Sequence, residues 1–294
     1  MIPRAASITH QHILSVINTE CQRLANRDVI RLLDAGCGDG VLLAYLHQAL
    51  RQLRPEYVFD LYGFDVSDGG IQRQGFLDSA RDTLSSVAPQ EDWNRKLSLV
   101  ATNECWSCED GYYDIIVSNQ VLEHVKNLDR FFKETNRSLR EQGIGIHLFP
   151  LKNYLYESHL NLPFVHKIHS HDCLKSYIKL LSRMGLGKYR SHRRAHGVDL
   201  DVYAERHADY LHYYTNYVSY KQVMGWAKKH LLRASFRYTR EFYGSKLRSM
   251  FRLTPRYRYR VDRYVILDLL AVIVLKYISS VTLVLEKRET YRTR

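Results

Sequence analysis

Residues 32–40 read LLDAGCGDG, and this stretch decides the fold of the chain. The apolar run at 29–33 has the pattern of a buried parallel strand, and the segment VLLAYLHQAL at 41–50 is typical of a helix. The glycines between them carry no Cβ, so backbone N–H groups can come close to a ligand. Their spacing is G-x-G-x-G, whereas dinucleotide-binding folds have G-x-G-x-x-G. A cradle for a small molecule is therefore predicted, and a dinucleotide is the weaker interpretation.

Two further apolar runs end in polar residues. Residues 57–64 lead into Asp65, and YDIIVSN at 113–119 runs directly into QVLEHV at 120–125. In open α/β sheets, ligands lie beyond the carboxyl ends of the strands, and a carboxylate there can accept both hydroxyls of a ribose. The sequence therefore predicts a cleft where three strand ends converge.

These motifs resemble those of the class I S-adenosylmethionine (SAM)-dependent methyltransferases, in particular the group with LDxGCGxG, GxD and a later LEHV segment. The resemblance covers residues 28–150. It implies an α/β fold, a Rossmann-like seven-stranded doubly wound sheet with an antiparallel last strand, together with a mainly helical insertion. It also implies SAM as cofactor and S-adenosylhomocysteine as product. A Rossmann-like domain for another nucleotide is the alternative.

The resemblance assigns the cofactor contacts residue by residue. Asp34, Gly36 and Gly38 are expected at the methionine end of SAM, Asp65 at the ribose and Asn119 beside the amino-acid moiety. Near the adenine the family often has an acid at the end of the next strand, whereas this chain has TNE at 102–104, and we expect Asn103 to make the contact. The expected cofactor-binding residues are Asp34, Gly36, Cys37, Gly38, Asp65, Val66, Asn103, Asn119 and Gln120.

Charge and tyrosine content divide the chain into unlike halves. Residues 1–150 carry a net charge of −5 and residues 151–294 one of +17, and 17 of the 22 tyrosines lie in the second half. The second half is thus expected to meet an anionic or glycan acceptor. The basic, tyrosine-rich segment at 195–262 is expected to be an insertion between the last two strands that forms one wall of the acceptor site.

The remaining boundaries follow from periodicity. A helix that caps the cofactor is expected within residues 1–27, and the methyltransferase core within 28–194 and 279–289. The sixth strand is expected at 186–193 and the closing antiparallel strand at 280–287.

Targeting and metal signals are weak. The N-terminus has no uninterrupted apolar segment of the secretory type, so a cytoplasmic protein is expected. Five irregularly placed cysteines suit reduced thiols. Cys105 and Cys108 form a C-x-x-C, but zinc needs two more ligands and the cluster formed by His169, His171 and Cys173 is distant in sequence. No metal site is expected.

The segment YVILDLLAVIVL at 264–275 could be mistaken for a membrane span. It contains Asp268, and it is much shorter than the roughly 20 residues that a span requires. A buried helix is predicted, with no transmembrane span. Peripheral contact with the inner face of the membrane, through the basic insertion, remains a hypothesis because Lys and Arg are attracted to anionic lipid.

Methyl transfer to a hydroxyl requires an aligned acceptor and one base. If Gln120 opens a helix, Glu123 and His124 lie three and four residues further on and share its face. After the fifth strand, the chain supplies Glu157 and His159. We expect His159, or alternatively His124, to be the general base, with Glu157 orienting it or holding substrate. In metal-assisted relatives an acid stands at the position of Gln120, which is a poor ligand. The competing interpretation is that both histidines are structural.

Residues 157–166 match a pattern, E-x-H-x-x-L-P-F-V-H, that looks like that of bacterial sugar or polysaccharide methyltransferases. We therefore expect O-methylation of a glycan or lipid-linked saccharide, free or phosphorylated. The alternatives are an RNA methyltransferase, in which the Arg- and Tyr-rich stretch would hold phosphates and stack bases, and a non-catalytic SAM-binding protein.

Overall fold

The computed structural model describes residues 2–24, 27–67, 75–157, 159–260 and 265–287. Its main sheet has the order β3-β2-β1-β4-β5-β9-β8, in which β1 to β5 are parallel and β9 is antiparallel to both of its neighbours. The expected doubly wound sheet with an antiparallel last strand is confirmed. Its strands are β1 (Val29–Ala35), β2 (Val58–Val66), β3 (Leu97–Val100), β4 (Tyr113–Asn119), β5 (Leu139–Phe149), β8 (Leu232–Ser235) and β9 (Val281–Lys287).

The register of the central strands sets up the cleft. Asp34 pairs with Gly63 of β2 on one side and with Val117 of β4 on the other. Asp65 and Asn119 each follow those partners by two residues, so the three polar residues come to one edge of the sheet. Parallel pairing in this register therefore brings together residues that are more than 80 positions apart in the chain.

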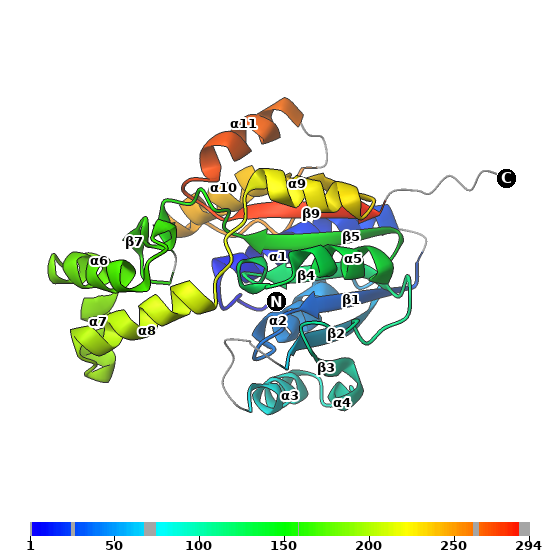
Figure 1. Cartoon of the computed structure of the whole chain (residues 1–294). Helices are drawn as coiled ribbons and strands as arrows, with labels where there is room; N and C mark the ends of the chain where they lie inside the picture. Colours follow the sequence, from blue (N-terminus) through cyan, green and yellow to red (C-terminus); the bar gives the residue numbers. More distant parts are fainter. Residues whose placement is uncertain (1, 25–26, 68–74, 158, 261–264, 288–294) are drawn as a thin grey trace.

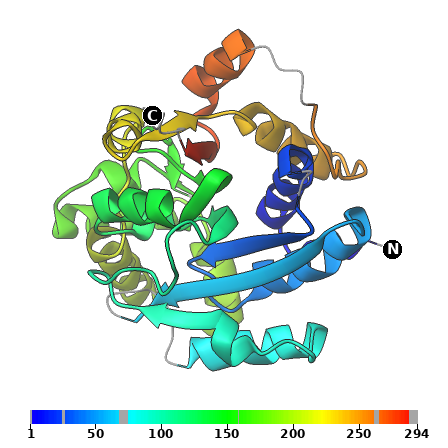
Figure 2. The same cartoon turned by 90° about the vertical axis from the view of Figure 1, so that its right-hand side faces the viewer.

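Helices cover both faces of the sheet (Figure 2). One face packs against α1 (Ile8–Glu20), α2 (Val41–Leu53) and α10 (Thr239–Met250), and the other against α5 (Leu128–Ser138) and α9 (Tyr220–Lys229). The remaining helices of this part are α3 (Phe76–Val87), α4 (Trp93–Lys96), α11 (Val265–Leu275), and the 3-10 turns η1 (Cys21–Leu24) and η2 (Leu122–His124).

A helical subdomain, residues 156–213, lies beyond the carboxyl ends of the parallel strands (Figure 1). It has its own apolar core, which includes Leu162, Ile178 and Tyr203. The subdomain thus lies at the same edge of the sheet as Asp34, Asp65 and Asn119. Its elements are β6 (Tyr156–Glu157), β7 (Leu162–Pro163), η3 (Val165–Lys167), α6 (His171–Arg183), α7 (Tyr189–His196) and α8 (Leu200–Tyr213).

The expected sixth strand at 186–193 is wrong. Most of this segment belongs to α7, whose sequence YRSHRRAH contains no β-branched residue. The sixth strand in chain order within the main sheet is instead β8, and it comes from inside the segment 195–262. Because β8 is a four-residue edge strand paired only with β9, its sequence pattern is too short to stand out.

The helix expected at 264–275 forms as α11, but the expectation that it is buried is wrong. Among residues 266–275, Val272 and Leu275 are the only large apolar side chains that are buried, and Ile266 is 73% exposed. The physical reason is that α5, α9 and α10 already cover the sheet, so α11 packs on α10 from outside. Of the helices that the structure describes, none is long and apolar enough to cross a bilayer.

Phe242→Ala tests whether α10 belongs to the core. Phe242 is 1% exposed, and its ring centroid lies 4.9 Å from that of His12 of α1. Its truncation should lower the free energy of unfolding by about 3–5 kcal/mol, because it leaves a cavity. Phe251 is 67% exposed, so Phe251→Ala is the matched control and should change stability by less than about 0.5 kcal/mol. Urea denaturation measures both, and equal stabilities would contradict the packing of α10.

Candidate active site

The glycine turn after β1 is held to the end of β2 by backbone and carboxylate hydrogen bonds. The Gly36 N–H donates to the Phe64 carbonyl at 2.8 Å. The two oxygens of Asp65 accept from the Gly38 N–H at 2.8 Å and from the Val66 N–H at 2.7 Å. Asp65 therefore shapes the turn as well as facing the cleft.

Gly36 is required by space and by conformation. Its φ is +85°, and a Cβ placed on it would lie 2.6 Å from Cγ2 of Val121. The turn after β1 thus lies directly against the Val121 side chain, in the segment that follows β4, with no space for a Cβ between them.

A cavity of about 220 Å³ lies over these strand ends. A second cavity, of about 100 Å³, shares Gly36, Asp65, Val121 and His124 with the first, so the two form one cleft. The first cavity is polar and the second is bordered by apolar side chains such as Val100. An elongated ligand with a polar end and a flat, less polar end matches this shape.

Three buried polar atoms of residues that border the first cavity have no hydrogen-bond partner within the described part of the chain: His10 Nδ1, Asp34 Oδ1 and Asn119 Oδ1. Burial, and secondarily the charge of Asp65, raise the pKa of Asp34 to about 8. A cationic donor bound there would satisfy both oxygens and favour the charged carboxylate. The ammonium of the methionine end of SAM is such a donor, so these residues fit the cofactor.

Most of the expected cofactor residues line this cleft. Asp34, Gly36, Cys37, Gly38, Asp65, Asn119 and Gln120 border the first cavity, and Val66 borders the second. Asn103 is exposed and borders neither cavity, whereas Thr102, Glu104 and Trp106 border the second. The indole of Trp106 is buried, 4.9 Å from the ring of Phe64.

The sequence did not single out His10 as a residue of the cleft. His10 of α1 borders the first cavity, and burial lowers its pKa although Asp39 acts in the opposite direction. The sequence predicted a helix over the cofactor within residues 1–27. It could not predict which residue of that helix reaches the cleft, because this depends on how α1 packs on the sheet.

The expectation that Gln120 opens a helix is wrong. Gln120 has φ of +56°, and its N–H and its side-chain amide both donate to the Leu148 carbonyl, at 2.7 and 3.2 Å. The chain then makes only the short turn η2. As a result, Glu123 is fully buried while His124 reaches the cleft.

Glu157 and His159 form a hydrogen-bonded pair in the segment after β5. His159 Nδ1 lies 2.5 Å from Glu157 Oε1. The carboxylate also accepts from Tyr217 Oη at 3.0 Å and from the Leu160 N–H at 2.8 Å. Burial acts to raise the pKa of Glu157, but the hydrogen bond and charge of His159 outweigh it and hold the pKa below its usual range. Glu157 is therefore a buried carboxylate that keeps its charge.

Tyr210 of α8 connects this pair to His124. Its Oη lies 3.1 Å from His159 Nε2 and 3.2 Å from His124 Nε2. His124 Nδ1 lies 2.7 Å from the Tyr214 carbonyl, which assigns the proton to Nδ1. Burial raises the pKa of Tyr210, so it stays protonated with one proton to donate. The Nε2 atoms of His124 and His159 thus both face the Tyr210 hydroxyl. This hydroxyl can donate its proton to only one of them, so the other can accept a hydrogen bond from a different donor.

We call His124, Glu157, His159, Tyr210 and Tyr217 the His–Tyr–Glu cluster. His124 borders both cavities of the cleft, so the cluster adjoins the cofactor site. Sequence analysis named the first three residues and missed the two tyrosines. Tyr210 lies seven positions after Tyr203 on α8, and residues seven apart share a helix face, so a helical signal existed for Tyr210. Tyr217 lies beyond the end of α8, and no local pattern points to it.

Within the described ranges, one group of side chains has the spacing of a metal site: His171, Glu205 and Asp209, between α6 and α8. The Lys175 ammonium already pairs with Glu205, and none of these residues borders the cofactor cleft. That the enzyme uses no resident metal therefore stays a prediction.

The sheet order, the glycine turn, the acid after β2 and the unpartnered polar atoms together define a class I SAM-binding methyltransferase fold. The chain belongs to the methyltransferase domain family, whose model matches residues 10–186. It is therefore a SAM-dependent methyltransferase. No curated protein matches the chain in sequence.

Solved structures similar to the chain share little sequence with it. YcgJ of Bacillus subtilis is 14% identical with a TM-score of 0.47, over 96% of this chain and 100% of that one. A SAM-dependent methyltransferase of Mesorhizobium loti is 11% identical with a TM-score of 0.44, over 90% and 95%. The carbon methyltransferase CurJ is 13% identical with a TM-score of 0.49, over 95% and 54%. At this similarity the acceptor has to be inferred from the residues of the chain itself.

Asp65→Ala should weaken S-adenosylhomocysteine binding by roughly 10- to 100-fold, because each hydrogen bond to a charged group contributes about 1.5–3 kcal/mol. Calorimetric titration measures the change. Asp78 is an exposed carboxylate on α3, and Asp78→Ala should leave the affinity unchanged. Equal affinity of both variants and the parent would remove Asp65 from the site.

Glu123→Gln should change stability in a pH-dependent way. Burial raises the pKa of Glu123 to about 8, against the lowering effect of a backbone hydrogen bond and with a smaller upward contribution from the charge of Glu157. A folded-state pKa above the unfolded value means that the parent loses stability as pH rises from about 5 to 8. The neutral amide avoids that loss. The free energy of unfolding of the variant should therefore rise relative to that of the parent between about pH 5 and 8, and should not change relative to it below about pH 5. Urea midpoints at pH 4.5 and 8 test this; a constant difference would contradict it.

Proposed function

We propose that the chain methylates a hydroxyl group of a saccharide, either a glycan or a lipid-linked saccharide, including phosphorylated forms. The His–Tyr–Glu cluster beside the cofactor cleft carries this proposal. Bound SAM supplies an electrophilic methyl group, and a hydroxyl acceptor must lose its proton as the new bond forms. An imidazole is suited to accept that proton near neutral pH.

His159 is the better base of the two histidines. Its Nδ1–H faces the charged carboxylate of Glu157, which stabilises the imidazolium that forms when Nε2 takes a proton. His124 donates instead to a neutral carbonyl, and burial lowers its pKa. We therefore assign His159 as general base, Glu157 as the group that orients and stabilises it, and His124 and Tyr210 as groups that position the acceptor hydroxyl.

The helical subdomain offers features that suit an anionic saccharide. A cavity of about 660 Å³ between α6, α7 and α8 is bordered by Arg183, Arg190, Arg193 and Arg194. Guanidinium groups bind phosphate with paired hydrogen bonds. Tyr213 is 61% exposed at the end of α8 and offers an aromatic face for a sugar ring. The motif at 157–166 that resembles sugar methyltransferases supplies Glu157 and His159 of the cluster.

Labelled SAM incubated with the protein and fractionated cell extract identifies the acceptor class. The proposal predicts label in a fraction that resists nuclease and is sensitive to glycosidase or mild acid. Label that disappears with nuclease treatment would establish an RNA acceptor instead. No transfer into any fraction, with cofactor binding intact, would favour a non-catalytic SAM-binding role.

His159→Ala should lower turnover by roughly 10²- to 10⁴-fold while SAM affinity stays unchanged, because it removes the general base. His169 is an exposed histidine ten positions further on, and His169→Ala should retain parental turnover. Transfer of label into the acceptor fraction measures turnover, and calorimetry measures affinity. A His159→Ala variant within a few-fold of the parent would show that alignment alone suffices.

A further inference from the structure

Helix α11 carries an exposed apolar surface. Large apolar side chains on α11 and just after it are exposed by 37–73%. In Figure 1 the helix projects from the end of the molecule, beyond α9 and α10. We define the α11 surface as Ile266, Leu267, Leu269, Leu270, Ile273, Val274, Tyr277 and Ile278.

The charged and buried positions of α11 face inward. Val272 and Leu275 are buried, and α11 packs on α10. Asp268 is its one acidic residue; its carboxylate is 12% exposed and lies 4.0 Å from the Arg240 guanidinium of α10. The outward side of the helix is therefore uniformly apolar. Such a face on a helix that is otherwise held in place marks an interaction surface.

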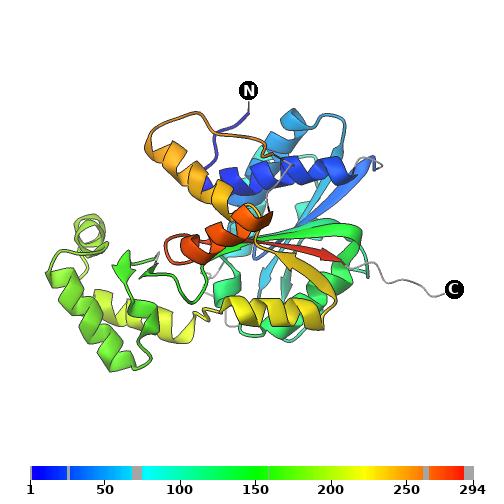
Figure 3. The same ribbon diagram turned by 90° about the horizontal axis from the view of Figure 1, so that it is seen from above.

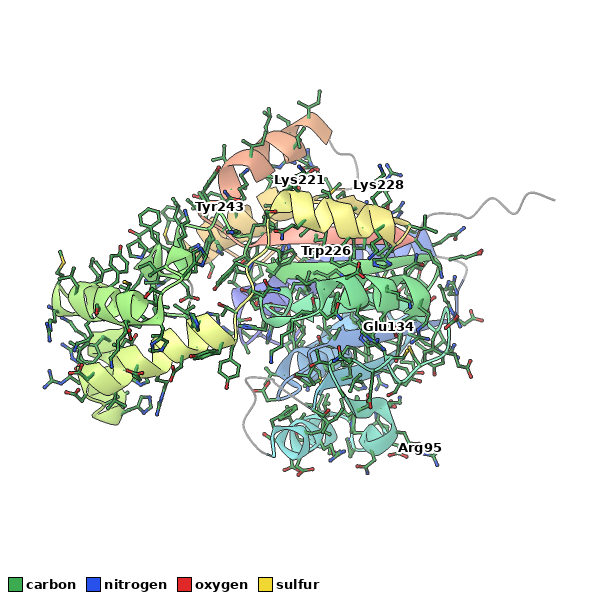
Figure 4. All side chains as sticks on the ribbon, viewed as in Figure 1. Arg95, Glu134, Lys221, Trp226, Lys228 and Tyr243 are labelled. Carbon is green, nitrogen blue, oxygen red and sulfur yellow. The ribbon has the colours of Figure 1, made fainter. Side chains whose placement is uncertain are left out.

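Cations lie close to this surface. Arg240 of α10, whose side chain is 44% exposed, lies 4.0 Å from Asp268 of α11. Lys276 follows the helix directly, and its Nζ lies 5.1 Å from the centre of the Tyr277 ring. Figure 3 looks onto this end of the molecule, with α9, α10 and α11 together, and Figure 4 labels Lys221 and Lys228 on α9.

We infer that the α11 surface docks on an anionic lipid bilayer, with the apolar side chains entering the boundary between headgroups and acyl chains. Helices that lie in this boundary combine an apolar face with flanking Lys or Arg that reach the negative headgroups. Tyr277 and Lys276 have the amphipathic form favoured at that depth. The inference does not depend on which acceptor the enzyme methylates.

A second copy of the chain is the less suitable occupant. In a symmetric dimer through α11, the basic residues around the surface would be brought toward their own copies, and like charges across an interface are unfavourable. An anionic bilayer offers both an apolar interior and the opposite charge. The eleven residues of α11 are too few to span a bilayer, so docking stays at its surface.

Flotation with vesicles tests the inference on the full chain. The probes are phosphatidylcholine vesicles with and without about 30% phosphatidylserine, at low and at 0.5 M salt. The test variant is Leu270→Glu/Ile273→Glu. Leu180 and Met184 of the α6 region are exposed by 55% and 67%, close to Leu270 at 54%, so Leu180→Glu/Met184→Glu is the matched control. S-adenosylhomocysteine affinity confirms that each variant is folded.

The parent and the control should float with the anionic vesicles, less so at high salt, and the Leu270→Glu/Ile273→Glu variant should bind at least tenfold more weakly.

Tryptophan fluorescence gives a second readout. The emission of an Ile273→Trp variant should shift to shorter wavelength on anionic vesicles, and that of a Leu180→Trp variant should not. Equal binding of parent and test variant would overturn the inference, as would no vesicle binding by the parent. A parental dimer that binds no vesicle and dissociates in the test variant would assign the surface to a second copy.

Discussion

The Asp65 carboxylate is the contact on which the rest of the cleft depends. One oxygen accepts from the Gly38 N–H and the other from the Val66 N–H, so a single side chain joins the turn after β1 to the end of β2. Because Gly36 also lies against Val121, the end of β4 is held to the same turn. Three strand ends are thereby placed before any ligand binds, which is the preorganisation that cofactor binding needs.

The His–Tyr–Glu cluster depends on a buried charge. Glu157 remains ionised without exposure because His159, Tyr217 and the Leu160 N–H all donate to it. Nearby Glu123, which is equally buried and has no such donors, is pushed toward its neutral form. The two carboxyl groups thus differ in charge because Glu157 has both the hydrogen bonds and the charge of its neighbour His159, the proposed base.

The charge asymmetry of the chain corresponds to a division of its surface. The acidic first half builds most of the sheet and its cofactor edge, whereas the basic second half supplies the helical subdomain, the edge strand β8 and the cations around α11. The arginine-lined cavity and the α11 surface belong to different elements of that half. The proposed acceptor site and the proposed membrane contact thus lie on separate parts of the basic half.

Local sequence determined the fold class and most of the cofactor cleft. Glycines, an acid after a strand and buried parallel strands are signals read within a few residues, and Asp34, Gly36, Asp65 and Asn119 lie where they were expected. Tertiary structure alone decided the rest. Tyr210 joins His124 to His159 only because the helical subdomain folds back over the strand ends, and α11 is exposed only because other helices already cover the sheet. Contacts between distant segments leave no local pattern, since they depend on which surfaces remain to be covered once the core has packed.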